Sequence, residues 1–132
     1  MLFRSEVPVG AIIVKDNEVI GSGHNQVIHT NNVTSHAEIN AIIDASKNTN
    51  NYRLNNAKMY VTLEPCHMCA KAIIDARIDE VIFAAPEPKT GSIISIDNIY
   101  ERIKFNHKTS YKYGLLQNES SNLLKKFFKT KR

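Results

Sequence analysis

The first clear pattern along the chain is a nearly continuous apolar run at residues 9–14, Val-Gly-Ala-Ile-Ile-Val. A short run of this kind is typical of a strand that is buried on both faces. Asp16 and Asn17 follow with turn-forming side chains, and residues 18–23 resume with alternating character. We therefore expect residues 9–23 to form a β-hairpin.

A helical pattern follows a polar segment. Residues 25–33 read as a polar loop, and residues 37–45 carry the apolar positions of a helix that faces the core. Thr34 or Ser35 is suited to cap this helix. If Ser35 is the cap, Glu38 falls at the third helical position, which is the capping-box arrangement.

The middle of the chain predicts a strand, a helix and a second strand. Residues 47–56 form an asparagine-rich connector, and residues 58–63 have the pattern of a strand. Pro65 then suits the first turn of a helix that runs to about Arg77. Residues 80–85 are again an apolar strand.

The last third of the chain adds a loop and three further elements. The proline-rich residues 86–91 must be a loop, and residues 94–102 suggest a short helix. Residues 108–113 predict a strand and residues 115–129 a terminal helix. This order of elements implies an α/β fold in which helices pack over a sheet of about five strands.

Length and composition favour an ordinary globular protein. The 132 residues suffice for one domain, 1–132, and the composition is 42% hydrophobic and 23% charged. No apolar run approaches the roughly 20 residues that a bilayer-spanning helix needs. The first residues lack the pattern of a secretory signal, so we expect a cytoplasmic protein without a membrane partner. The net charge of +4 permits a polyanionic partner such as nucleic acid without requiring one.

The chemistry is concentrated in two short motifs, His36-Ala37-Glu38 and Pro65-Cys66-His67-Met68-Cys69. Cys66 and Cys69 are three residues apart, so on a helix they share a face and can hold one ion. Their place in a first turn favours the thiolate form. His36 would begin the other helix and complete a set of three ligands. Three protein ligands leave a fourth position for water, which is typical of catalytic zinc.

Glu38 distinguishes this prediction from its alternatives, since a carboxylate beside activated water can transfer protons. A structural zinc site needs no acid two residues from a ligand. Three alternatives stay open at this point: a redox-active dithiol pair, a closed zinc site, and a His36 that only caps or packs. The fourth ligand of a closed site would be a further histidine, namely His24, His29 or His67.

With these motifs in place, the sequence resembles the cytidine/deoxycytidylate deaminase superfamily, and within it the bacterial tRNA adenosine deaminases. The motif His-x-Glu followed by Pro-Cys-x-x-Cys marks the superfamily. Further stretches carry the narrower resemblance: residues 6–11, Asn25, 51–54, 60–66, 89–91 and 127–128. Glu87 departs from the pattern, because the family typically has aspartate there.

The resemblance implies a three-layer α-β-α fold with a central mixed sheet, the cytidine deaminase-like fold. It implies one zinc ion per chain, held by His36, Cys66 and Cys69. It also implies that Glu38 transfers protons while water attacks C6 of adenine and ammonia leaves. Asn25 would hold the target nucleoside, although an asparagine that merely supports a tight turn is the alternative.

The resemblance further implies a homodimer that deaminates the wobble adenosine in the anticodon stem-loop of tRNA. A basic and apolar terminus fits such a partner: Lys125, Lys126, Lys129, Lys131 and Arg132 accompany Leu123, Leu124, Phe127 and Phe128. A solvated basic face on a packed helix explains the same pattern. Two other functions remain open, a deaminase of free bases or nucleotides and a non-catalytic zinc-bearing RNA-binding module.

Overall fold

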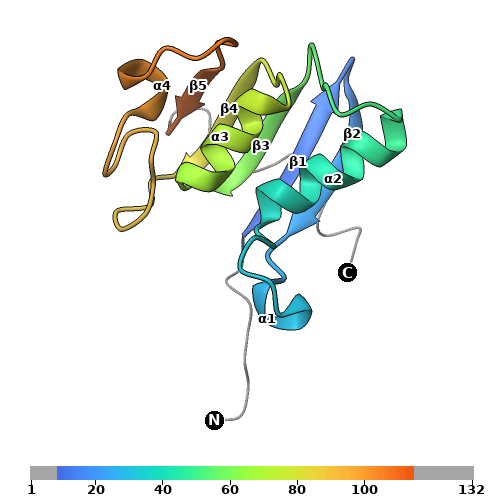
Figure 1. The fold of residues 1–132 in the computed structure, drawn as a ribbon, viewed down its shortest axis with the longest axis horizontal. Helices are drawn as coiled ribbons and strands as arrows, with labels where there is room; N and C mark the ends of the chain where they lie inside the picture. The colour runs from blue at the N-terminus through green and yellow to red at the C-terminus, as the bar shows by residue number, and fades with distance from the viewer. Residues whose placement is uncertain (1–8, 115–132) are drawn as a thin grey trace.

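The structure, a computed structural model, describes residues 9–114, which form a mixed sheet with helices (Figure 1). The terminal helix expected at 115–129, the basic end of the chain and the first part of the motif at 6–11 lie outside the described residues. The elements are β1 (Gly10–Lys15), β2 (Glu18–His24), α1 (Val27–Thr30), α2 (Ala37–Thr49), β3 (Lys58–Leu63), α3 (His67–Asp75), β4 (Glu80–Ala85), α4 (Ile99–Arg102) and β5 (Ser110–Tyr113).

The five strands are arranged in the order β2-β1-β3-β4-β5. β1 pairs antiparallel with both β2 and β3, whereas β3, β4 and β5 run parallel. The predicted mixed sheet of about five strands is confirmed. The predicted hairpin is also confirmed, and Asp16 and Asn17 make its turn with φ angles of 53° and 64°, which is the type I′ geometry that two-residue hairpins favour.

The core lies between one face of the sheet and helices α2 and α3, which cover that face side by side (Figure 1). Alternate residues of the central strands point into it, as the period of two requires. They include Ala11 and Ile13 of β1, Met59 and Val61 of β3, and Val81 and Phe83 of β4. Each of these is completely buried.

Helix α2 packs closely on β2 because small residues meet at the contact. Ala41 and Ala45 form its buried stripe, and Gly21 and Gly23 face it from the strand. A Cβ atom on Gly23 would come within 2.5 Å of the Ala37 carbonyl oxygen. This close packing fixes where α2 begins relative to the sheet.

Two predictions about α2 were wrong. Its N-cap is His36 rather than Thr34 or Ser35, so Glu38 takes the second helical position and no capping box forms. The helix also continues to Thr49, into the segment expected to be a connector, and ends on Asn50 with a φ of 53°. Asparagine tolerates this left-handed conformation and can therefore end the helix. The polar residues before it did not end the helix.

The other differences concern element ends. The polar loop at 25–33 contains the one-turn helix α1, and the short helix expected over 94–102 is reduced to α4. Pro65 precedes the N-cap of α3, Cys66, instead of lying in the first turn, and α3 ends at Asp75 rather than near Arg77. Among the helices of residues 9–114, none combines the length and apolar character of a bilayer-crossing segment.

Candidate active site

Two helix starts meet beside the sheet and bring the three predicted ligands together. His36 is the N-cap of α2, Cys66 is the N-cap of α3, and Cys69 lies in the first turn of α3. The His36 Nδ1 atom lies 3.7 Å from the Cys66 sulfur and 3.5 Å from the Cys69 sulfur. The three ligand atoms all lie within 4.8 Å of one another.

These separations fit a tetrahedral zinc ion. Zinc–sulfur bonds of about 2.3 Å and zinc–nitrogen bonds of about 2.0–2.1 Å place tetrahedral N and S ligands about 3.6 Å apart. The two measured nitrogen–sulfur distances, 3.7 and 3.5 Å, bracket that value. One imidazole and two thiols are also the donor types that zinc prefers. The residues present therefore fit the metal that the motif predicts.

The two thiols differ in pKa because one is hydrogen-bonded to the other. The hydrogen bond from Cys69, helped by backbone N–H groups at the start of α3, lowers the pKa of Cys66 to about 5. The same hydrogen bond, together with burial, raises the pKa of Cys69. Cys66 is half-buried and Cys69 fully buried. Cys66 thus already favours the thiolate form that binds a metal.

Glu38 lies next to the ligands on the first turn of α2, and only 4% of the residue is exposed. Burial raises its pKa to about 7, with a further contribution from the nearby Cys66 thiolate. A carboxyl group with a pKa near neutrality can both accept and donate a proton under physiological conditions. This is the acidity that a proton-transferring group requires.

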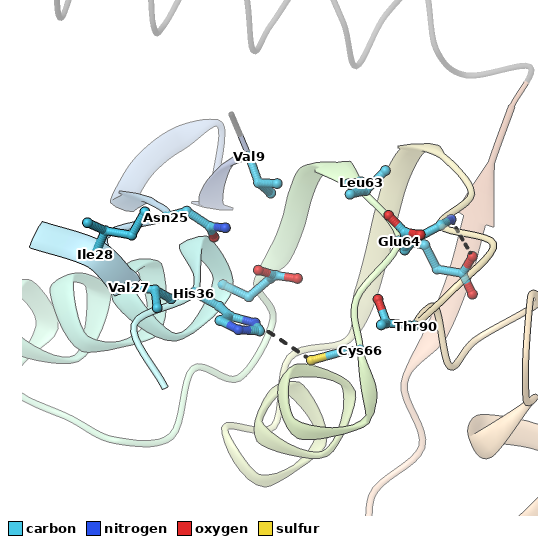
Figure 2. Close-up of a pocket in the computed structure, with 11 residues that line it drawn as sticks. Val9, Asn25, Val27, Ile28, His36, Leu63, Glu64, Cys66 and Thr90 are labelled. Carbon is cyan, nitrogen blue, oxygen red and sulfur yellow. Dashed lines mark hydrogen bonds between the residues drawn. The ribbon is translucent and has the colours of Figure 1, made fainter. Parts of the chain in front are cut away.

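A cavity of about 350 Å³ opens directly over the ligands. Figure 2 shows Asn25, Val27 and Ile28 on one side of it and Leu63, Glu64 and Thr90 on the other, with His36 and Cys66 between them. The complete lining consists of these eight residues with Val9, Glu38 and Glu87. An apolar cavity with a few convergent polar groups is the usual form of a small-ligand site.

Asn25 connects this cavity to the start of α2. Its side-chain oxygen accepts a hydrogen bond of 2.8 Å from the Ala37 backbone N–H. The residue therefore stabilises the first turn of α2 while it also lines the cavity. With the oxygen engaged, the amide nitrogen is the group suited to donate to a bound ligand. This position is compatible with a role in holding the nucleoside and with a purely structural role, the two alternatives that the sequence left open for Asn25.

The other histidines that were considered as a fourth ligand lie elsewhere. The Nε2 atom of His67 is 2.9 Å from the Asp97 carboxylate, which also pairs with Arg102. Within residues 9–114, His24 and His29 do not belong to the group of ligand atoms around His36. The described residues thus bring three ligands together, as an open site requires.

Sequence reasoning missed Glu64. It lies between Leu63 and Pro65, is only 3% exposed, and lines the cavity. Burial would raise the pKa of this carboxyl, but hydrogen bonds from Ile94, Ser95 and Glu87 hold the pKa below its usual range. The available signal was an acidic residue that directly follows the apolar strand and precedes the first cysteine of the motif.

Comparison with known proteins gives a consistent set of relatives. The family model described as MafB19-like deaminase matches residues 3–132. The tRNA-specific adenosine deaminase of Aquifex aeolicus (strain VF5) is 44% identical over 126 residues, which cover 96% of this chain and 83% of that protein. The protein of the same name from Haemophilus influenzae is 44% identical over 128 residues, covering 96% and 74%.

Solved structures agree with these sequence relatives. A structure from a study of A-to-I editing by tRNA:A34 deaminases matches with a TM-score of 0.77 and 39% identity, covering 80% of this chain and 82% of that one. Guanine deaminase from Bacillus subtilis matches with a TM-score of 0.58 and 32% identity, covering 74% and 72%. The predicted cytidine deaminase-like α/β fold is confirmed by the first of these structures.

Proposed function

Because this chain belongs to the MafB19-like deaminase family, alongside tRNA-specific adenosine deaminases, we propose that it hydrolytically deaminates adenosine to inosine at the anticodon wobble position of tRNA. The observation that supports this most directly is the convergence of His36, Cys66 and Cys69 beside the buried Glu38. We propose the three as ligands of one zinc ion per chain and Glu38 as the catalytic residue.

The reaction needs a nucleophile and a proton carrier at one place. When bound, zinc supplies Lewis-acid activation of water for attack on the ring carbon. Glu38 accepts the proton that this water releases and delivers protons to the purine ring nitrogen and to the departing ammonia. Its pKa of about 7 suits both directions of transfer. Its burial also keeps competing bulk water away from the carboxylate.

The cavity is suited to a base that has left its stack. Val27 and Ile28 offer an apolar wall, and Asn25 offers an amide that can orient the nucleoside. A base in a single-stranded loop is unstacked at lower cost than one in a duplex. An anticodon loop is therefore a physically reasonable source of the substrate.

We further propose a homodimer located in the cytoplasm, with residues 1–132 as one deaminase domain.

The test is an inosine assay on a mixed tRNA pool, with zinc measured on the same sample. Wild-type protein should contain one zinc ion per chain and form inosine in tRNA. Glu38→Gln should lower the rate by about 10²–10⁴-fold, because it removes the proton carrier. The zinc content and the melting temperature of this variant should stay near the wild-type values. Glu101→Gln, an exposed change on α4, is the matched control and should remain active. Wild-type turnover in the Glu38→Gln variant would refute the assigned role.

A deaminase of free bases is the second candidate, favoured by the match to the guanine deaminase of Bacillus subtilis. The same zinc chemistry serves both reactions, and the shape of the cavity selects the substrate. Parallel assays with the free bases guanine and cytosine and with the nucleoside adenosine separate the two functions. Turnover of a free base without inosine in tRNA would replace the tRNA proposal.

A further inference from the structure

Glu64 accepts hydrogen bonds from both ends of the loop at residues 87–95. Three consecutive backbone N–H groups donate to its Oε2 atom, from Ile93 at 2.9 Å, Ile94 at 2.7 Å and Ser95 at 3.0 Å. The Ser95 hydroxyl and the Glu87 N–H donate to its Oε1 atom. A single buried carboxylate thus receives five donors from residues 87–95. Charge-assisted bonds of this kind are stronger than neutral ones.

Gly91 allows the loop to approach this carboxylate. A Cβ atom on Gly91 would lie 2.7 Å from the Glu64 Oε2 atom and closer still to the rest of the carboxyl group. Real Cβ atoms essentially never make contacts this short. A side chain at position 91 would therefore displace the Glu64 carboxylate from the place where it accepts these five bonds, so the absence of a Cβ atom at Gly91 helps to keep the carboxylate and the loop together.

The loop held in this way forms one wall of the cavity. Glu87 and Thr90 line the cavity, and Figure 2 shows Thr90 on the side opposite Val27 and Ile28. The loop is also bound to the backbone of Pro65, whose carbonyl accepts from the Ser92 N–H at 3.0 Å. Both anchors precede Cys66 directly in the chain. The wall and the proposed metal ligand are consequently positioned by the same short segment.

From these contacts we propose that Glu64 is a positioning residue, which holds the 87–95 loop as the wall of the substrate cavity and so determines how tightly substrate is bound. The carboxylate bonds to the loop, and Glu87 and Thr90 of this loop line the cavity, so its effect reaches the substrate through them. The effect on substrate rests on the proposed function, whereas the holding of the loop rests on the contacts alone.

The test measures loop protection and kinetics on the same variants. Glu64→Gln keeps the size of the side chain but removes its charge. It also replaces one acceptor oxygen with an amide NH₂ group, which cannot accept hydrogen bonds from the backbone N–H groups of the loop. We expect the amide protons of Ile93, Ile94 and Ser95 to exchange with solvent about 10–100-fold faster. The KM for an anticodon stem-loop RNA should rise by a similar factor, with kcat within about threefold of wild type. Zinc content should remain at one ion per chain.

Two further variants and a control accompany Glu64→Gln. Gly91→Ala reaches the same contact from the loop side and should reproduce the fast exchange and the raised KM. Ser95→Ala removes only the hydroxyl donor and should show a smaller rise in KM. This milder variant tests the proposal if the other two do not fold. Glu80→Gln is the matched control, a glutamate of 9% exposure on β4 that pairs with Lys58 and Lys112. Its KM and loop protection should match wild type.

The outcomes separate this proposal from the proposed function. Unchanged exchange of the three amides in Glu64→Gln would overturn the role of Glu64, whatever the activity. A lower kcat at unchanged KM would also overturn it, because that result indicates a loss of active protein rather than an altered cavity. If the wild-type protein forms no inosine, the exchange data still decide whether Glu64 holds the loop, and only the assigned reaction fails.

Discussion

Asn25 joins the start of α2 to the proposed substrate cavity. Its side-chain oxygen binds the Ala37 N–H, and its amide faces the cavity. Asn25→Asp keeps an acceptor for that N–H but loses the amide donors, so we expect stability within about 0.5 kcal/mol of wild type and a strong loss of activity. Asn25→Ala loses both and should lower the free energy of unfolding by about 0.5–2 kcal/mol. Urea denaturation and the inosine assay check the pair. Full activity in Asn25→Asp would restrict Asn25 to its structural role.

At the residue scale, the candidate ligands were predictable and Glu64 was not. One histidine and two cysteines three residues apart are typical of a metal site, and few other functions require this combination. Glu64 instead depends on five donors from residues 23 to 31 positions away, and no local pattern reports such contacts. The role of Glu38 follows from chemistry, but its pKa of about 7 follows from burial that only the fold provides.

At the scale of elements, the contact between β2 and α2 makes a prediction about stability. Gly23→Ala introduces a Cβ atom within 2.5 Å of the Ala37 carbonyl oxygen and the Ala41 nitrogen. We expect α2 to shift and the free energy of unfolding to fall by about 1–3 kcal/mol. Urea denaturation measures this. Ser22→Ala is the control, because the bond from residue 22 to Asp44 comes from the backbone N–H and survives the change. An equal effect of both substitutions would argue against the close contact.

The strands were predicted better than the helix ends, for a physical reason. Residues 58–63 and 80–85 carry enough apolar side chains that burial in the sheet determines their conformation. The helix starts are determined by tertiary contacts instead. His36 is the N-cap of α2 because the packing of Gly21 and Gly23 and the Asn25 hydrogen bond place the chain there, although Ser35 has the better local capping preference.

For the whole molecule, the proposed zinc ion would link α2 to α3 and thereby stabilise the fold. A ligand that binds only the folded state adds about 4 kcal/mol at a thousandfold excess over its Kd. Removal of zinc with a chelator should therefore lower the melting temperature, and added zinc should restore it. Glu38→Gln should keep this response because it leaves the ligands in place. Cys69→Ala should melt at the same temperature with and without chelator, and a persistent response in that variant would contradict the assigned ligand set.

Both helices that meet at the site have N-cap residues of types that are not favoured at this position. Neither His36 nor Cys66 makes a side-chain capping bond, whereas serine, threonine, aspartate or asparagine there would contribute about 1 kcal/mol each. Helix stability and the proposed metal binding therefore favour different residues at these two positions. Stabilising substitutions chosen from helix-cap preferences should therefore leave positions 36 and 66 unchanged, because they would remove two of the three proposed metal ligands.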